Sequence, residues 1–453
     1  MDGSADVVVV GARCAGSPLA TLLAREGVRV TLVEQAEFPR DTLSTHLFEA
    51  DGLAFLNRLG ITEKLRATGA PFVRRVDNRT GDFRAIVDWP QEPGDVGGVA
   101  GIRRFVLDPI LAQAAEEAGA DLRLGTKVTG LRTQAGRVAG VRVAGANGED
   151  ELPARLVVGG DGRNSTVARL CGARKYNLTP NQRALFYGYF EDADPGPEPT
   201  FVFHRWADRL VIACPTDSEL YLALTMPDLA ERDRFRADLE GSFMEHVLSC
   251  EPVAAAVGGA RRVGKILGAV RWEGFFREPS GPGWVLTGDA GHFKDPVVGR
   301  GIADAFHQAE ALAPAIVKGL NGSEQDLDSS LAEWGRWRDA DFQDHYWFAA
   351  NLGTGGSLPA VVPEVARRLH ARGKLQQLLE IQTHRIKPSR VLTLPRLLGA
   401  TARLLARRGS DRLGTLREVG ALVAQEPRRQ WLNRRPAYAA PGTARDAGPT
   451  EVE

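Results

Sequence analysis

The chain of 453 residues has few cysteines and no long apolar run. Its four cysteines, Cys14, Cys171, Cys214 and Cys250, lie far apart and form no Cys-x-x-Cys pair, which argues against a disulfide scaffold and a structural zinc site. No apolar run approaches the roughly 18 residues that a membrane-spanning helix needs, and the first residues do not have the pattern of a secretory leader. We therefore expect no metal, no transmembrane segment and a location in the reducing cytoplasm.

Charge of one sign is not in excess either, since 57 Lys and Arg face 57 Asp and Glu. This balance does not indicate a nucleic-acid-binding protein. It conceals an uneven distribution, because residues 364–435 hold 17 basic and five acidic side chains. Helices are predicted there over Glu364–Arg385, Pro395–Arg408 and Thr415–Gln425. Their basic faces are either simply solvated or a docking surface for an acidic partner, an anionic substrate or a membrane surface.

The first forty residues contain two apolar strands with a helix between them. Asp6–Val10 and Val28–Val33 are predicted as buried parallel strands, because their apolar residues do not alternate with polar ones. Pro18 stands in the first turn of the predicted helix. Glu34 closes the second strand. This order of strand, turn, helix, strand and acid is typical of a Rossmann-like dinucleotide-binding unit, in which the acid binds a ribose.

The turn between the first strand and the helix is rich in glycine. Gly11 and Gly16 occupy the first and third positions of the Gly-x-Gly-x-x-Gly fingerprint, and Arg13 replaces the second glycine. Glycines at these positions let the backbone approach a pyrophosphate at a helix N-terminus. Arg13 either lies beside the phosphates or points outward, and the sequence does not decide between the two.

Two acidic turn motifs follow later apolar strands. They are Asp161-Gly162 and Gly288-Asp289. Either dipeptide alone is a common turn pair. Their order along the chain, each after an apolar strand, together with the N-terminal unit and the glycine Gly301 that opens a further predicted helix, is much less common by chance than either dipeptide alone.

These motifs resemble those of the para-hydroxybenzoate hydroxylase-like family, the group A flavoprotein monooxygenases, over residues 1 to about 320. The resemblance implies FAD as cofactor and NAD(P)H as electron donor. It implies that Arg40, and Arg104 in Arg104-x-x-Leu-Asp108, contact FAD. It also directs the helix after Gly301 at the flavin, where the positive end of its dipole stabilises negative charge. The residues expected to bind FAD are Gly11, Ala12, Arg13, Ala15, Gly16, Glu34, Arg40, Arg104, Val128, Asp161, Gly162, Gly288, Asp289, Pro296, Gly299, Gly301, Ile302 and Ala303.

The middle of the chain has the pattern of a different domain. Strands are predicted over residues 72–89, 184–190, 201–203, 210–214 and 220–226, and a helix over residues 232–248. The resemblance implies that these strands form a sheet over the flavin. The expected fold class is therefore α/β: a Rossmann-like FAD-binding domain with an inserted antiparallel β-sheet substrate domain and a C-terminal helical region.

The predicted domain boundaries follow these patterns. They are 1–70, 99–180 and 263–322 for the FAD-binding domain, 71–98 and 181–262 for the substrate domain, 323–435 for the C-terminal helical region and 436–453 for a flexible tail.

Three polar side chains are candidates for catalysis. The resemblance places Lys294 and His292 beside the isoalloxazine, where Lys294 orients an anionic substrate oxygen or steadies a flavin charge. His46 faces the ring or donates a proton. The alternative for Lys294 is an ordinary surface lysine, and for His292 and His46 it is a structural role in a turn or loop. The aromatic side chains expected to line a pocket for a planar or apolar substrate are Tyr187, Phe201, Phe203, Tyr221 and Phe293.

The expected function is an FAD-dependent monooxygenase of secondary metabolism that uses NAD(P)H and O2 to hydroxylate or epoxidise an aromatic or polycyclic small molecule. Reduced FAD activates oxygen itself, so the lack of a Ser/His/Asp triad is no objection. One alternative is a reductase or dehydrogenase of C=C bonds, because the motif order also resembles geranylgeranyl reductase-like proteins. Another is a non-redox FAD-containing cyclase or binding protein. A flavin halogenase is disfavoured, because its Trp-x-Trp-x-Ile-Pro motif is absent and no lysine precedes Lys64.

Overall fold

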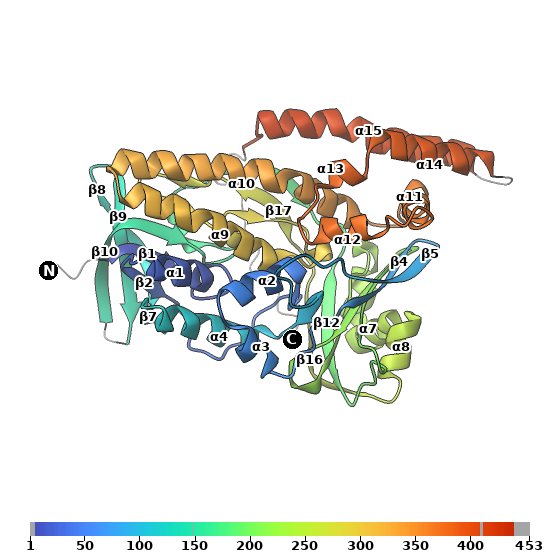
Figure 1. Ribbon diagram of the computed structural model, residues 1–453, viewed down its shortest axis with the longest axis horizontal. Helices are drawn as coiled ribbons and strands as arrows, with labels where there is room; N and C mark the ends of the chain where they lie inside the picture. The colour runs from blue at the N-terminus through green and yellow to red at the C-terminus, as the bar shows by residue number, and fades with distance from the viewer. Residues whose placement is uncertain (1–4, 147, 408–410, 439–453) are drawn as a thin grey trace.

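The computed structural model describes residues 5–146, 148–407 and 411–438 (Figure 1). Its first sheet is centred on β1, which pairs in parallel with β2 on one side and with β10 on the other. The strand order is β18-β19-β10-β1-β2-β7. These strands are β1 (Ala5–Val10), β2 (Val30–Val33), β7 (Asp121–Arg123), β10 (Gly148–Gly159), β18 (Ser280–Gly281) and β19 (Trp284–Leu286). The parallel strands predicted at the N-terminus are thus confirmed, with the second beginning at Val30.

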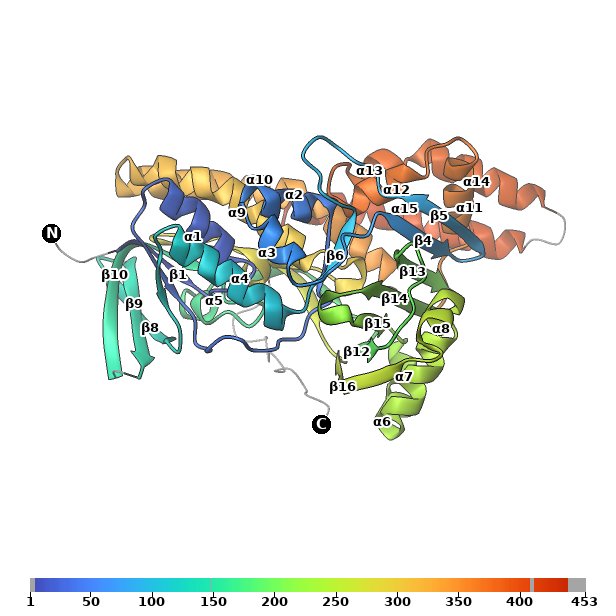
Figure 2. The same ribbon diagram turned by 60° about the horizontal axis from the view of Figure 1, so that its bottom comes forward.

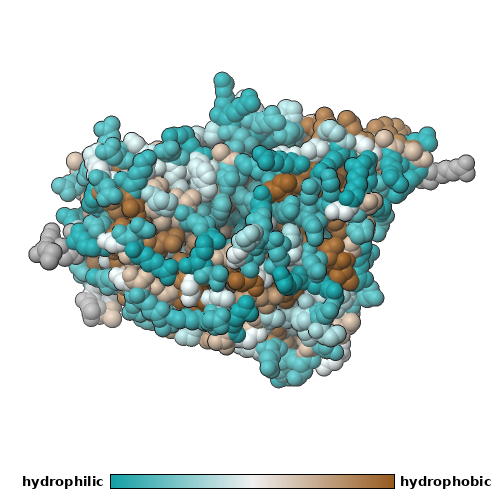
Figure 3. All heavy atoms as spheres, in the orientation of Figure 1, coloured by the Kyte–Doolittle hydropathy of each residue, from teal (hydrophilic) through white to brown (hydrophobic). Residues whose placement is uncertain are grey.

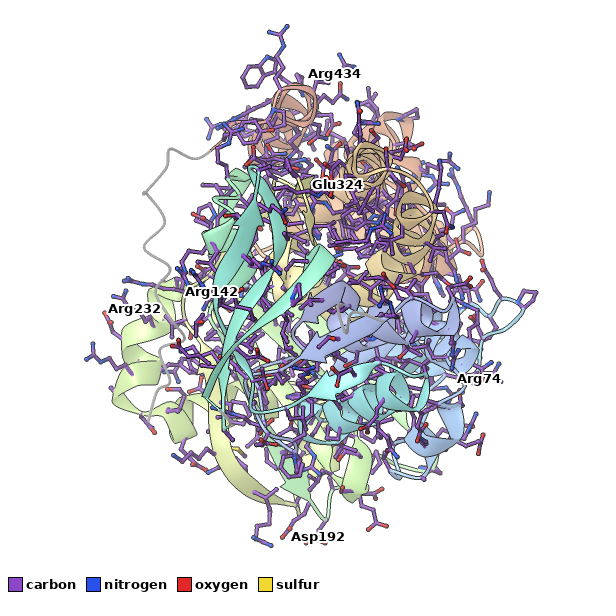
Figure 4. The ribbon with its side chains drawn as sticks, turned by 90° about the vertical axis from the view of Figure 1, so that its left-hand side faces the viewer. Arg74, Arg142, Asp192, Arg232, Glu324 and Arg434 are labelled. Atoms are coloured by element: carbon purple, nitrogen blue, oxygen red, sulfur yellow. The ribbon has the colours of Figure 1, made fainter. Side chains whose placement is uncertain are left out.

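Different layers cover the two faces of this sheet (Figure 2). Helices α1, α9 and α10 pack on the side of Val7 and Val9. The hairpin layer, which consists of β8 and β9 and the part of β10 that pairs with β9, packs with α5 on the side of Val8 and Val10. Figure 4 shows the hairpin layer at one end of the molecule, with Arg142 on β9. A parallel strand covered on both faces needs apolar residues throughout, which explains why β1 lacks alternation. The covering elements are α1 (Gly16–Arg25), α4 (Arg104–Glu117), α5 (Thr166–Leu170), α9 (Gly301–Leu320), α10 (Glu324–Leu352), β8 (Lys127–Gln134) and β9 (Arg137–Gly145).

A second sheet lies beside the first, in the order β16-β12-β15-β14-β13-β4-β5. Its neighbours pair antiparallel except for β13 and β4, which run in parallel. The segment 75–88 therefore joins the predicted sheet with an orientation that the sequence did not indicate. The strands are β4 (Arg75–Thr80), β5 (Phe83–Asp88), β12 (Leu185–Glu191), β13 (Thr200–Trp206), β14 (Arg209–Pro215), β15 (Tyr221–Thr225) and β16 (Arg261–Ala269).

Helices cover the outer face of the second sheet. The helix predicted over residues 232–248 is two helices, because Asp238 leaves helical geometry (φ −147°, ψ 86°) and its carboxylate accepts a hydrogen bond from the backbone N–H of Gly241. The outer helices are α6 (Arg232–Ala237), α7 (Leu239–Leu248) and α8 (Glu251–Val257).

Short elements connect the two sheets. They are β3 (Leu47–Glu49), β6 (Val99–Gly101), β11 (Lys175–Pro180), β17 (Glu273–Arg277), β20 (His292–Phe293), α2 (Ala50–Arg58), α3 (Thr62–Arg66) and the short 3-10 helices η1 (Asp217–Glu219), η2 (Leu229–Glu231), η3 (Gly288–Ala290) and η4 (Pro296–Val298). β3 pairs with β6, and β17 pairs with both β11 and β20.

The C-terminal region is helical, as predicted, with different helix ends. The predicted helix over residues 364–385 is broken near Gly373, whose φ of 65° is left-handed. The last helix is longer than predicted. The helices are α11 (Val361–His370), α12 (Gln376–Gln382), α13 (Pro388–Val391), α14 (Leu394–Ala406) and α15 (Arg412–Arg434). Among the described residues, no helix combines the length and apolarity that a membrane crossing requires.

The surface of the C-terminal helices carries both basic and apolar groups. Part of the positive charge is balanced internally, since the buried carboxylate of Glu364 lies within 4.0 Å of guanidinium nitrogens of Arg367, Arg403 and Arg407. Exposed leucines such as Leu394 and Leu413 accompany the arginines, and Figure 3 shows apolar surface over this part of the molecule. The docking of an acidic partner or anionic substrate at this region stays a prediction, and so do the domain boundaries. The predicted tail 439–453 lies outside the described residues.

Candidate active site

The glycine turn after β1 is pressed against neighbouring backbone. A Cβ on Gly16 would lie 1.9 Å from the carbonyl oxygen of Gly11, and a Cβ on Gly11 would lie 2.7 Å from that of Gly160. Gly11 also has a φ of 99°, which L side chains rarely adopt. Only glycine fits both positions. The turn leads directly into α1, whose first N–H groups are free of intrahelical partners. This cradle fits the pyrophosphate of a dinucleotide.

Glu34 at the end of β2 is fixed by the same turn. Its side chain is 5% exposed, and its two oxygens accept hydrogen bonds from the backbone N–H groups of Ala12 (3.1 Å) and Ala36 (3.0 Å). Arg13 Nε lies 3.6 Å from the carboxylate, so Arg13 points along the turn and not outward. The acid predicted to bind a ribose is thus held rigidly beside the glycine turn.

Asp108 gathers three of the neighbouring polar groups, although it was not among the predicted site residues. Its carboxylate accepts hydrogen bonds from Arg104 (2.6 and 3.0 Å), from Arg13 (3.2 Å) and from the thiol of Cys14 (3.6 Å), and it is fully buried. Burial raises the pKa of the Cys14 thiol, which therefore stays protonated. The signal in the sequence was the four-residue spacing from Arg104 to Asp108, which places both on one face of α4. Asp108 positions the two arginines beside the turn.

The Asp161 carboxylate caps a helix. It accepts hydrogen bonds from Ser165 Oγ (2.5 Å) and from the backbone N–H groups of Thr166 (2.7 Å) and Val167 (3.2 Å) at the start of α5. Gly162 beside it has a φ of 81°. The motif thus fixes the loop after β10, and its carboxylate is largely occupied.

Gly288 and Asp289 lie against the glycine turn. Gly288 has a φ of 58°, and a Cβ there would lie 2.7 Å from the Cβ of Ala15. Its N–H donates to Gln308 Oε1 of α9 at 2.9 Å. Burial raises the pKa of the Asp289 carboxyl to about 6, against the opposing effect of Arg163 and Arg104. Asp289 also lies beside the start of α9, since a Cβ built on Gly301 would lie 3.9 Å from Oδ1 of Asp289.

We expect the FAD affinity of the apoprotein to fall as the pH drops below about 6. If Asp289 holds the ribityl chain of FAD, as the resemblance implies, the hydroxyls of that chain donate hydrogen bonds and need the ionised form of the carboxyl. Because burial raises the pKa of the free carboxyl to about 6, binding releases a proton, and affinity is full above this pH and is lost as the pH falls through it. Quenching of FAD fluorescence measures the affinity. An Asp289→Asn variant should bind more weakly with no such pH dependence, and an equal dependence in both proteins would contradict the assignment.

The other predicted cofactor residues are spread along the edges of this site. Gly299 has a φ of 68°, and the neighbouring Pro296 begins the short helix η4. Ile302 and Ala303 are buried in α9. Arg40 is exposed on the loop before β3, and Val128 is buried in the hairpin layer.

Lys294 is a buried member of an ion-pair network and not a surface lysine. Its Nζ lies 2.6 Å from Asp304 Oδ2, and both side chains are at most 5% exposed. Arg300 also contacts Asp304 (3.4 Å) and reaches Asp51 (2.7 Å) and Glu49 (3.2 Å). Burial lowers the pKa of Lys294 and raises that of Glu49 to about 8. Sequence reasoning missed this network, because Glu49 and Asp51, the partners of Arg300, come from a segment far from Lys294, Arg300 and Asp304 in the chain.

His46 presents an unused hydrogen-bond donor. It is fully buried at a φ of 59°, and its Nδ1 accepts a hydrogen bond from the backbone N–H of Arg104 at 3.1 Å. Burial, and then Arg104, lower its pKa to about 3, so the ring is neutral at pH 7. A neutral ring whose Nδ1 accepts carries its proton on Nε2. That Nε2 has no hydrogen-bond partner among the described residues.

Two tyrosines pack around His46 with unpartnered hydroxyls. The ring centroids of Tyr187 and Tyr189 lie 5.2 and 5.9 Å from that of His46. Both phenolic oxygens are buried, and neither has a hydrogen-bond partner in the described part of the chain. Buried polar atoms without partners are rare in native proteins, so this cluster is a candidate contact for a flavin or substrate.

The remaining candidates are divided between different cores. Tyr187, Phe201 and Phe203 share one core on the second sheet, with Phe293 packed against it. Leu47, Val297 and Val298 belong to the same core. Tyr221 belongs instead to the core under α6–α8, on the opposite face of the sheet. His292 is buried between Phe276 and Phe342 (centroids at 4.5 and 5.2 Å), and burial lowers its pKa well below the ordinary value. The structure does not bring His292 or Tyr221 together with His46.

Comparisons with known proteins identify the family of the chain. A family profile described as "FAD binding domain" matches residues 4–333. The chain is similar to a tryptophan 2-halogenase of Chondromyces crocatus, with 27% identity over 76% of this chain and 66% of that protein, just under two thirds of its length. It is similar to a 6-methylpretetramide 4-monooxygenase of Streptomyces rimosus, with 29% identity over 72% of this chain and 79% of that protein. The fold is similar to that of a flavoprotein/dehydrogenase from Cytophaga hutchinsonii, with a TM-score of 0.71 and 17% identity, covering 93% of this chain and 100% of that one.

Proposed function

Because the chain belongs to the FAD binding domain family, we propose that it is a monooxygenase that uses NAD(P)H and O2 to hydroxylate or epoxidise an aromatic or polycyclic small molecule. The similarity to a monooxygenase along most of both chains supports this reaction class. Electron donor, substrate class and a cytoplasmic location in secondary metabolism are parts of this proposal.

The observation that carries the proposal is the cluster of unpartnered polar atoms on His46, Tyr187 and Tyr189. It combines aromatic faces, which suit a planar substrate, with an N–H and two hydroxyls that can hold a substrate oxygen. The cluster adjoins the N-terminus of α4, where Arg104 pairs with Asp108 of the same helix, and Asp108 in turn binds Arg13 of the glycine turn. Tyr187 and Tyr189 lie on β12 of the second sheet, and His46 contacts both the tyrosine rings and the start of α4.

Bound FAD supplies electron transfer from NAD(P)H and the activation of oxygen. The chain's own residues bind and orient. The glycine turn, Glu34 and Asp289 hold the dinucleotide, and the first turn of α9 directs its positive dipole end toward negative charge. His46 Nε2–H donates to a substrate or oxygen atom, and the buried Lys294 contributes a fixed positive charge. The apolar core around Tyr187 excludes water from the site.

The full-length protein loaded with FAD tests this function. NADH or NADPH added without oxygen should bleach the flavin absorbance. With a panel of polycyclic phenols under ¹⁸O2, the turned-over substrate should gain one ¹⁸O atom. Product formed by reduction of a C=C bond without oxygen, or halide incorporation without ¹⁸O, would assign a reductase or halogenase instead. Product formation without any flavin reduction would assign a non-redox role.

A His46→Asn variant examines the proposed donor. Asparagine tolerates the left-handed backbone and offers an oxygen to the Arg104 N–H, but it lacks the Nε2–H. We expect an unchanged FAD content and a kcat lowered by about 100-fold, the scale of a lost proton donor. His370→Gln is the matched control. His370 is exposed and packs on Phe83, outside the cluster around His46. Equal kcat values in both variants would exclude His46 from the reaction.

A further inference from the structure

Three side chains from three separate helical segments converge beside the active site. His307 belongs to α9, Asp341 to α10, and His384 follows α12. The Nε2 atoms of both histidines lie 3.0 Å from Asp341 Oδ2, and the three ligand atoms all lie within 4.8 Å of one another. Imidazole and carboxylate together form a common donor set for divalent transition-metal ions.

His384 is held in a position that hydrogen bonding does not explain. Its φ is 59°, and its side chain is 4% exposed. Despite the short distance to Asp341, neither ring nitrogen makes a well-directed hydrogen bond with a described residue. Its ring stacks on that of His345, with centroids 3.8 Å apart. A buried imidazole whose Nδ1 has no partner among the described residues and whose Nε2 faces only a carboxylate points to a missing ligand.

His384, when neutral, also has too few N–H groups to face both of the carboxylates beside it. Its Nε2 faces the carboxylate of Asp341, and its Nδ1 lies 4.0 Å from Oδ1 of Asp304. A neutral imidazole carries one N–H and can therefore serve only one of these two carboxylates. A cation bound at Nε2 removes the conflict, because the single proton then sits on Nδ1 and faces Asp304. Metal-bound histidines commonly direct the other N–H at a carboxylate in this way.

We propose that His307, Asp341 and His384 bind one divalent transition-metal ion of the zinc class, with a coordination position left open to water. The 3.0 Å separations are close to the edge of about 3.3 Å that a tetrahedral site with bonds of 2.0–2.1 Å would have. His307 is 35% exposed and Asp341 23%, so the ion has a path from solvent. The sequence analysis considered only cysteine-based zinc motifs and expected no metal, so this proposal departs from that expectation.

The bound ion ties the C-terminal region to the body of the protein. It links α9 and α10 to the segment after α12 and, through His384 and Asp304, adjoins the buried network of Lys294. The proposal is independent of the reaction that the flavin performs.

The test uses the full-length chain, expressed without a polyhistidine tag and stripped with a chelator. Calorimetric titration with Zn²⁺ should show one ion per chain at micromolar or tighter affinity, and Co²⁺ should give the visible absorption of a low-coordinate nitrogen–oxygen site. Asp341→Asn and His384→Asn should each lower the affinity by about 100-fold or more. His370→Gln should bind like the wild type, because His370 lies outside the cluster.

Flavin absorbance and circular dichroism show that each variant is folded before it is compared. Weak binding, in the millimolar range, to the wild type would overturn the proposal. So would equal binding to the folded Asp341→Asn variant, because the ion would then occupy another site. Loss of binding in both ligand variants, with retention in the control, would support it.

Discussion

A Gly16→Ala variant should bind FAD about ten- to a hundredfold more weakly than the wild type, the range that corresponds to 1–3 kcal/mol of overpacking. The added Cβ would lie 1.9 Å from the carbonyl oxygen of Gly11 and 2.9 Å from Cγ1 of Val9. Neither the turn nor β1 can move away, because Gly11 is itself packed against Gly160. The turn must open, and its N–H groups then no longer face the pyrophosphate.

The fraction of protein that retains FAD after gel filtration, and the Kd from fluorescence titration, measure this effect. Gly420→Ala is the matched control, since a Cβ at Gly420 in α15 meets no atom within 4 Å. The control should keep full FAD content. A Gly16→Ala protein with wild-type FAD affinity would show that the cofactor does not use this cradle.

Asp304→Asn should lower the free energy of unfolding by about 3–5 kcal/mol, the range for breaking a buried ion pair from one side. The variant leaves the ammonium of Lys294 and the guanidinium of Arg300 buried without this carboxylate. Burial by itself would raise the pKa of Asp304, but Lys294 and Arg300 outweigh it and hold the pKa well below its usual range. In the wild type this stabilisation is therefore present above about pH 4 and is lost as the pH falls further.

Urea denaturation at pH 7 compares the variant with Glu310→Gln on the same helix. Glu310 pairs with Arg58 at 2.7 Å, but the two side chains are 46% and 55% exposed. The control should lose less than about 1 kcal/mol, as exposed ion pairs do. If both variants lost the same small amount, the network around Lys294 would carry no special stability.

The sequence predicts those parts of the fold and site that depend on local pattern. The apolar run Asp6–Val10, the glycines Gly11 and Gly16, and Glu34 follow one another along the chain, and each has a single geometry that suits it. The break at Asp238, within the helix predicted over residues 232–248, was missed although its cause is also local. An Asp caps a following turn as readily as it continues a helix.

The parts that could not be predicted depend on pairs brought together by the fold. Asp108 lies 95 residues from Arg13, and Arg300 lies 249 residues from Asp51. No periodicity in the sequence reports such a distance. The side of the second sheet on which Tyr221 lies is decided by strand register, and a shift by one residue reverses it. The role of His384 could not be predicted either, because it depends on the contact of three helical segments in the folded protein.

The strand order of the first sheet also determines when its strands can pair during synthesis. The central strand β1 leaves the ribosome first, yet it pairs with β10, which ends at Gly159, and β10 in turn waits for β19, which begins at Trp284. Pairings between segments so far apart in sequence form slowly. Helix α1 follows at once and can cover the Val7 and Val9 face of β1, but the Val8 and Val10 face stays uncovered for over a hundred residues of elongation, until the hairpin layer and α5 are made. An uncovered apolar strand in this period is exposed to aggregation and depends on chaperones.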